Sequence, residues 1–189
     1  MASILKVDTI QDQSGNNIIN ENADTITIGA SGDTITVPTG ATFSAPGIAN
    51  TPAFFAYRAG SAVSIPDNTN TLLIMDTEVF DTNSAFDTST GFFTPQESGK
   101  YYVFAQFRLN TATNIDNVEC VFRVNGSVTT PNIFSSIYNS QLNTTQVSGI
   151  VTLNGSTDYV APYGVQYSGG PISTSTNGIY FYGYKLIGV

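Results

Sequence analysis

The sequence has no histidine and no tryptophan, and it has one cysteine among 189 residues. Without histidine there is no imidazole base, no Ser-His-Asp or Cys-His nucleophile, and no His-ligated zinc or haem. The lone Cys120 cannot form a disulfide within the chain, so we expect it to be a small buried residue on a strand. These absences exclude most hydrolase chemistry and a disulfide-stapled secreted domain.

Charge and long apolar runs are also scarce. Charged residues make up 11% of the chain, and the net charge is -8, which argues against a nucleic-acid partner because phosphate contacts need clustered Lys and Arg. Apolar runs such as 72–75 are far shorter than the ~20 residues of a membrane helix. Residues 1–8 lack the basic start and apolar core of a signal peptide, so we expect neither secretion nor membrane insertion.

Small neutral polar residues are abundant instead: 25 Thr, 18 Ser and 17 Asn, together with 17 Gly. Thr fits the pleated surface of a strand, whereas Asn, Ser and Gly favour turns. No segment shows helical periodicity. The composition therefore predicts an all-β protein.

Residues 1–50 form the first of two regions and contain a single aromatic residue, Phe43. The triplet Asp-Thr-Ile occurs at 8–10, 24–26 and 33–35, and the last two copies alternate apolar and polar residues, which predicts short half-buried strands. A few short strands cannot offset their ordering entropy alone. We therefore predict a β stem that pairs with other chains around a three-fold axis or docks on a larger scaffold; a disordered acidic tail is the alternative. The candidate anchor residues of the stem are Ile4, Leu5, Val7, Ile10, Ile26, Ile28, Ile35 and Val37.

Residues 52–189 form the second region, which is rich in aromatic residues. Nine apolar segments separated by turn signals predict one domain, a β-sandwich or jelly roll. The segments lie at 53–58, 72–80, 91–94, 101–109, 118–125, 133–138, 145–153, 159–167 and 178–187.

The last predicted strand has apolar side chains on both faces, with tyrosines at alternate positions on one of them. Such a strand is central in its sheet or covered by another subunit. A tyrosine ladder suits a subunit interface, because each ring buries apolar area and keeps its hydroxyl available for a partner. Packing within the sandwich core is an equal alternative. The candidate trimer-interface residues are Phe54, Tyr102, Phe104, Tyr180, Tyr182 and Tyr184.

Four motifs of the second region occur in the order of a known family: Pro-Ala-Phe-Phe-Ala-Tyr-Arg at 52–58, Gly-Phe-Phe-Thr-Pro at 91–95, Gly-Lys-Tyr-Tyr at 99–102 and Phe-Tyr-Gly-Tyr at 181–184. The region resembles the globular head of complement component one, subunit q, among the tumour-necrosis-factor-like jelly rolls. This resemblance implies a ten-strand jelly-roll sandwich that assembles as a homotrimer and binds ligands through exposed loops. Some members hold calcium at the trimer apex, but no acidic cluster here identifies such a site, and we predict no cofactor.

Residues 4–16 resemble the opening of fibre and structural proteins of tailed bacteriophages, especially those of marine cyanobacteria. The resemblance implies that this segment attaches to the virion or forms a trimeric stem below a displayed domain. It agrees with the expectation that residues 1–50 need partners.

Only one pair of carboxylates invites an enzymatic interpretation. Asp76 and Glu78 would share a strand face, but glycosidase carboxylates flank the scissile bond from opposite sides, so a solvated strand edge is favoured. We therefore predict a non-enzymatic virion protein, made in the host cytoplasm: a short homotrimeric tail or head fibre that displays its jelly roll for attachment to a host-surface glycan. A capsid cement protein without host recognition is the alternative, and a soluble signalling trimer is a third hypothesis.

Overall fold

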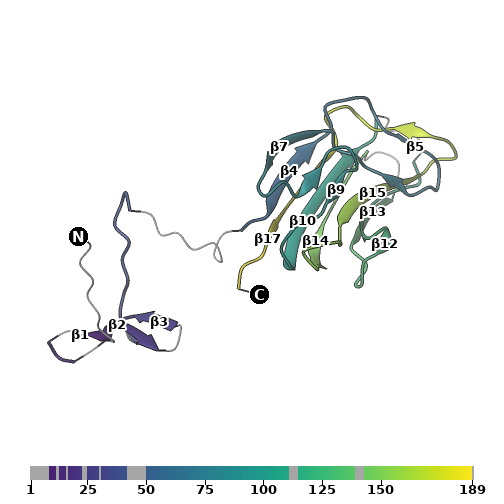
Figure 1. The fold of residues 1–189 in the computed structure, drawn as a ribbon. Coiled ribbons are helices and arrows are strands. Elements are labelled where there is room, and N and C mark those ends of the chain that lie inside the picture. Colours follow the sequence, from purple (N-terminus) through teal and green to yellow (C-terminus); the bar gives the residue numbers. More distant parts are fainter. Residues whose placement is uncertain are drawn as a thin grey trace. The chain divides into compact units, whose positions relative to one another are not determined.

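The computed structural model describes residues 9–11, 13–15, 17–22, 25–29, 31–41, 50–110, 115–138 and 143–188, and these are all strands, turns and loops. Within these ranges there is no helix long and apolar enough to cross a membrane. The chain divides into two compact units, Met1–Ala45 and Pro46–Val189, which we call the N-terminal unit and the head. Figure 1 shows both units along the chain.

The N-terminal unit contains a three-stranded antiparallel sheet in the order β1 (Thr9–Gln11), β2 (Asn17–Asn22), β3 (Thr25–Ile28). Ile10 lies opposite Ile19, and Ile19 lies opposite Ile28, so one row of isoleucines crosses all three strands. The Asp-Thr-Ile copy at 24–26 contributes to β3, Thr25–Ile28, as its alternation predicts. The predicted strand in the copy that starts at Asp33 was wrong, because none of the described strands forms a ladder with residues 34–37.

One sheet of the head has five antiparallel strands, and we call it the front sheet. Its order is β14 (Thr144–Leu153), β10 (Gly99–Arg108), β17 (Tyr180–Lys185), β4 (Ala53–Tyr57), β7 (Thr77–Asp81). The chain-terminal strand β17 therefore lies in the centre of the sheet, between β10 and β4. The sequence pattern of apolar residues on both faces predicts such a central position.

The second large sheet, which we call the back sheet, has seven strands. Its path is β12 (Ser127–Val128), β11 (Asn117–Val124), β15 (Val160–Tyr167), β9 (Phe92–Phe93), β8 (Phe86–Asp87), with β13 (Phe134–Tyr138) on β11 and β6 (Thr71–Leu72) on β15. A small separate pair joins β16 (Ile172–Ser173) to β5 (Ser64–Ile65). The head contains more strands, β4 to β17, than the ten that the family resemblance implies, because several of them are short segments of two residues.

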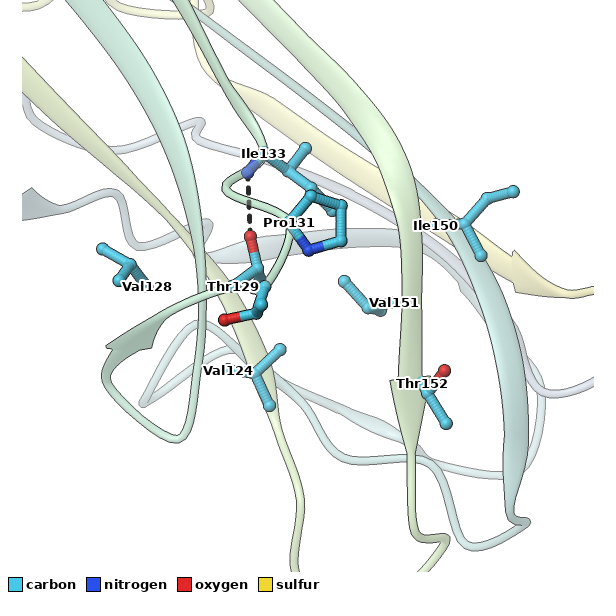
Figure 2. Close-up of a pocket in the computed structure, with 9 residues that line it drawn as sticks. Val124, Val128, Thr129, Pro131, Ile133, Ile150, Val151 and Thr152 are labelled. Atoms are coloured by element: carbon cyan, nitrogen blue, oxygen red, sulfur yellow. Dashed lines mark hydrogen bonds between the residues drawn. The ribbon is translucent and has the colours of Figure 1, made fainter.

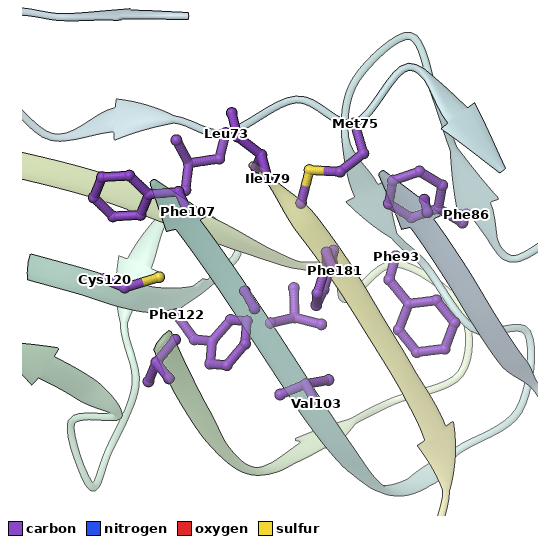
Figure 3. Packing of buried hydrophobic residues seen from close by; sticks show 14 of the residues in the cluster. Leu73, Met75, Phe86, Phe93, Val103, Phe107, Cys120, Phe122, Ile179 and Phe181 are labelled. Atoms are coloured by element: carbon purple, nitrogen blue, oxygen red, sulfur yellow. The ribbon is translucent and has the colours of Figure 1, made fainter. Parts of the chain in front are cut away.

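The hydrophobic core of the head lies between the front and back sheets (Figure 3). Phe54 stacks on Phe93 with ring centroids 4.4 Å apart and meets the edge of Phe181 at 4.7 Å. Cys120 is fully buried in the same core, as the sequence predicts, and burial raises the pKa of its thiol. Alternate residues of each long strand supply this core, which leaves the other face of each strand for contacts outside it.

One predicted strand, 72–80, is broken. It is replaced by β6 and β7, which belong to different sheets, and residues 73–76 connect them. Leu73 and Met75 are buried in the core, while Asp76 binds the backbone of a neighbouring loop. Every other predicted segment of the head contains an observed strand.

Candidate self-association surface

The outer side of the front sheet carries a continuous group of large rings, which we call the aromatic face. Strand alternation places the rings of β4, β10 and β17 there, because their neighbours in sequence point into the core, and strand register places Phe80 opposite Phe55. The face consists of Phe55, Tyr57, Phe80, Tyr102, Phe104, Tyr180, Tyr182 and Tyr184.

Strand register aligns the rings into rows. Phe104 lies opposite Tyr182, Tyr182 opposite Phe55, and Phe55 opposite Phe80, so four neighbouring strands contribute to one row. In the next row, Tyr102 lies opposite Tyr184. Cross-strand aromatic pairs of this kind stabilise a sheet by roughly 0.2–1 kcal/mol each.

The rings contact one another across the rows. Phe104 stacks on Tyr182 with centroids 4.9 Å apart and an interplanar angle of 12°, and it lies nearly parallel to Tyr180 at 5.8 Å. Phe55 meets Tyr180 and Tyr182 edge-on at 6.2 and 6.0 Å. These contacts hold the rings in a fixed arrangement but leave their outer surfaces uncovered, and Phe80 is 48% exposed.

The polar atoms of the aromatic face are few. The Tyr180 hydroxyl donates a hydrogen bond of 2.9 Å to Oε1 of Gln106. Partial burial raises the pKa of Tyr182, and the neighbouring phenols of Tyr102, Tyr180 and Tyr184 raise it further. The face is therefore neutral in its middle, as the core of a protein interface is.

Ion-pairing groups lie at one end of the front sheet. Lys185, the last residue of β17, binds Glu97 with a distance of 2.8 Å between Nζ and Oε2. Both side chains remain partly exposed, so this pair contributes little to the stability of the fold. Its position suits the polar rim that surrounds an interface core.

A groove lies beside the aromatic face, along β14 (Figure 2). This strand ends the order of the front sheet, so one of its edges has no strand of that sheet beside it. Within the groove the backbone N–H of Ile133 donates to Oγ1 of Thr129 at 2.8 Å. Ile133 packs against Gly149, where a Cβ would lie 2.6 Å from the isoleucine side chain.

The groove has two adjoining parts, with volumes of about 410 and 570 Å³. Pro131, Ile133 and Ile150 line both parts, and Tyr102 of the aromatic face lines the second. Ile150 is 55% exposed. The apolar surface therefore continues from the aromatic face around the β14 edge.

Five of the six predicted interface residues lie together on the aromatic face: Tyr102, Phe104, Tyr180, Tyr182 and Tyr184. Their role in assembly stays a prediction. The prediction that Phe54 lies at the trimer interface was wrong, because its side chain is fully buried within the core and has no surface for contact with a second chain. Sequence reasoning missed Phe55, Tyr57 and Phe80. The alternation of β4 could have found Phe55 and Tyr57, since both have the opposite parity to Phe54.

The predicted stem residues fall into two groups. Ile4, Leu5 and Val7 lie outside the described residues. Ile10, Ile26, Ile28, Ile35 and Val37 are all exposed, from 40% for Ile10 to 67% for Ile26. These apolar side chains of the N-terminal unit are therefore only partly covered within the single chain.

Asp76 and Glu78 do not form a carboxylate pair on one strand. Asp76 precedes β7, and its carboxylate accepts hydrogen bonds from the backbone N–H groups of Ala59 at 2.8 Å and Gly60 at 3.0 Å. Burial opposes ionisation of Asp76, but these bonds, with help from the Thr77 hydroxyl, outweigh it and lower its pKa. Asp76 thus acts as a structural acceptor for a loop. Among the described residues, no group of three or more Cys, Asp or Glu side chains could hold a metal ion.

Solved structures share the architecture of the head. The globular domain of zebrafish Complement 1qA matches with a TM-score of 0.50 and 20% identity, over 72% of this chain and 98% of that one. Murine APRIL matches with a TM-score of 0.50 and 14% identity, over 71% of this chain and 98% of that one. No protein-family model matches the sequence, and the comparison with curated proteins gives no match. The head therefore has the jelly-roll fold of the complement-head and tumour-necrosis-factor-like class.

Proposed function

We propose that this chain is a non-enzymatic bacteriophage virion protein that assembles as a homotrimer, with the N-terminal unit as stem or anchor and the head displayed for attachment to a host-surface glycan. The observation that carries the proposal is the aromatic face, a neutral and partly exposed group of eight rings on a rigid sheet. An apolar patch of this kind on a soluble domain marks an association site.

The arrangement of apolar surface supports a cyclic assembly of copies. In a three-fold ring, each interface joins two different surfaces of the same chain. The aromatic face offers one such surface, and the groove along β14 offers a second next to it. Each copy can place its β14 edge against the aromatic face of the next, and the ring closes after three.

The N-terminal unit supports a stem for a separate reason. Its isoleucine row, Ile10, Ile19 and Ile28, covers one face of a three-stranded sheet and is at least 37% exposed at each position. Three such sheets in a trimer could bury these rows against one another or against a virion protein. The resemblance of residues 4–16 to bacteriophage fibre proteins points to the virion as the place of attachment.

Display of three heads on one stem gives a mechanism for adhesion. Contacts that are weak singly combine into strong attachment when linked copies engage one surface together. The fold neighbours support a binding module, since the head shares their jelly roll.

Solution mass tests the assembly. Sedimentation or light scattering of the full chain should give three times the 20.1 kDa of a single chain. A chain that stays monomeric at micromolar concentration contradicts the proposed assembly.

Labelling with antibody against the head, viewed on virions by electron microscopy, tests the location. Fibre-tip labelling together with binding of the purified trimer to host cells supports the adhesin. Labelling over the capsid faces, with binding to empty capsids and none to cells, supports the cement alternative instead. Absence of the chain from virions contradicts both.

A further inference from the structure

The outer side of the back sheet carries a second set of tyrosines in a different chemical setting. Register places Asn117 of β11 opposite Tyr138 of β13 on one side and opposite Tyr167 of β15 on the other. Two residues along β11, Glu119 lies opposite Ser136. We call these five residues the polar platform.

A chain of hydrogen bonds fixes the centre of the polar platform. The Ser136 hydroxyl donates to Oδ1 of Asn117 at 2.6 Å, and Nδ2 of Asn117 donates to Oε1 of Glu119 at 2.8 Å. Asn117 is only 8% exposed, so both halves of its amide serve to position the serine and the carboxylate. Such second-layer bonds hold a binding group in one orientation before a ligand arrives.

The groups at the surface of the platform are left available. Tyr138 is 74% exposed, and among the described residues its ring has no aromatic partner and its hydroxyl no hydrogen bond. Within the same ranges, only Asn117 donates to Glu119, which leaves Oε2 of the carboxylate open. The platform therefore combines an exposed ring with a fixed acceptor.

The charge of the platform is negative. Partial burial raises the pKa of the Tyr167 phenol, and the nearby Glu119, Tyr138 and Asp67 raise it further. Glu119 thus lies close to the Tyr167 ring, and its field disfavours another anion. A ligand for this surface must supply hydrogen-bond donors to the carboxylate without carrying negative charge.

We propose that the polar platform binds one uncharged pyranose unit of a surface glycan, with the apolar face of the sugar ring against Tyr138 and its hydroxyls donating to Glu119. The inference rests on the proposed function and names the surface of the head that carries it out. A tyrosine ring provides apolar area with a polar rim, which matches the build of a sugar ring. Hydrogen bonds to an ionised carboxylate are roughly twice as strong as neutral ones.

The same surface fits other ligands less well. A protein partner would meet the charge of Glu119 within the platform and that of Arg123 farther along β11 on the same face, and interface cores are depleted of charge. A small cationic ligand would also be attracted by Glu119, but an exposed ion pair contributes at most about 1 kcal/mol, so charge alone does not hold such a ligand. A neutral sugar uses the ring and the fixed acceptor together.

The test uses the full chain and polyacrylamide conjugates that carry glucose, galactose, mannose or N-acetylglucosamine. Conjugates of glucosamine and glucuronic acid are the cationic and anionic comparisons. Binding is measured by biolayer interferometry with the protein immobilised, and oligomeric mass is measured on every variant by sedimentation.

We expect at least one neutral conjugate to bind. Tyr138→Ala and Glu119→Gln should each weaken that binding about tenfold, as expected for loss of a stacking or charge-assisted contact. Tyr138→Phe keeps the ring and should stay near the parent value. Glu78→Gln removes an exposed glutamate from β7 of the other sheet and should change nothing.

Other outcomes overturn the inference. If no neutral conjugate binds, if only the glucosamine or glucuronic acid conjugate binds, or if Tyr138→Ala binds as the parent does, the platform is not a site for neutral sugars. If trimers of Tyr138→Ala and Glu119→Gln still attach to host cells, the platform is not the attachment site, but the proposed function remains. If the chain binds a neutral sugar but is monomeric, the platform is supported as a sugar site and the proposed trimer is refuted.

Discussion

Phe104 lies at the β10 end of the aromatic face, next to β14, and its replacement by glutamate should separate the proposed trimer into monomers. The ring stacks on Tyr180 and Tyr182 and is partly buried within the single chain. In a trimer, the next copy would cover the part that remains exposed. Phe104→Glu would therefore bury a carboxylate without a partner at each interface.

The size of the effect follows from two contributions. Covering the remaining exposed part of the ring stabilises assembly by less than the roughly 1.5–3 kcal/mol of a fully buried phenylalanine. Burying an unpaired charge costs several kcal/mol. Together these contributions weaken assembly by about 5 kcal/mol for each chain. At ~1.4 kcal/mol per factor of ten, the association constant should fall by a factor of between 10³ and 10⁴.

Within the single chain the same substitution is milder. The two lost ring contacts contribute about 0.5–1.5 kcal/mol each, which is less than the stability of a typical domain of roughly 5–15 kcal/mol. We expect the head to stay folded by circular dichroism while the sedimenting mass falls to that of one chain.

The matched control for this test is Tyr138→Glu, which places the same charge at an exposed aromatic position on the back sheet. It should remain trimeric. A Phe104→Glu chain that still sediments as a trimer would refute the assignment of the aromatic face to the interface. A control that dissociates as well would show that added charge alone causes the effect.

Three further outcomes test the fold. Phe54→Ala should destabilise the head by about 3–5 kcal/mol, measured by denaturant unfolding, because it leaves a cavity in the core; Phe55→Ala, on the outer face, should cost much less in a monomeric background. Because the pKa of Asp76 is lowered by folding, its contribution is present above the ordinary carboxyl range and is lost as the pH falls through the lowered pKa. Asp76→Asn should therefore unfold more readily than the parent near neutral pH, and the difference should narrow in acid; a constant difference would count against the hydrogen bonds to the loop. Cys120 should resist thiol reagents until the head unfolds, since it is fully buried and its pKa is raised; rapid modification of the native protein would contradict the core packing.

Strand periodicity accounts for much of what could be predicted. The alternation of Tyr180, Tyr182 and Tyr184 with Phe181 places the tyrosines on one face of β17 whatever the fold. It does not say which face is inside when both are apolar. The pair Phe54-Phe55 shows the same ambiguity: Phe54 was predicted to lie at the interface, but it is buried in the core.

The break in the expected strand 72–80 could not be predicted from its own residues. The segment is apolar enough for one strand, but Leu73 and Met75 fill the core between the sheets, and the loop at 59–60 requires a carboxylate acceptor from Asp76. These demands come from segments distant in sequence. The polar platform was missed for the same reason, since Tyr138, Asn117 and Tyr167 come together only through strand pairing.

By itself, the sequence determined that histidine chemistry and an intrachain disulfide are absent, that the protein is built of strands, and that its two regions differ in composition. Those properties follow from composition and from the two-residue repeat of the extended backbone, both of which are local. The tertiary structure decided which faces are buried, which rings form the aromatic face, and which polar groups meet on the polar platform. Those choices depend on which distant strands become neighbours, because a strand's faces acquire different environments only when a second sheet covers one of them.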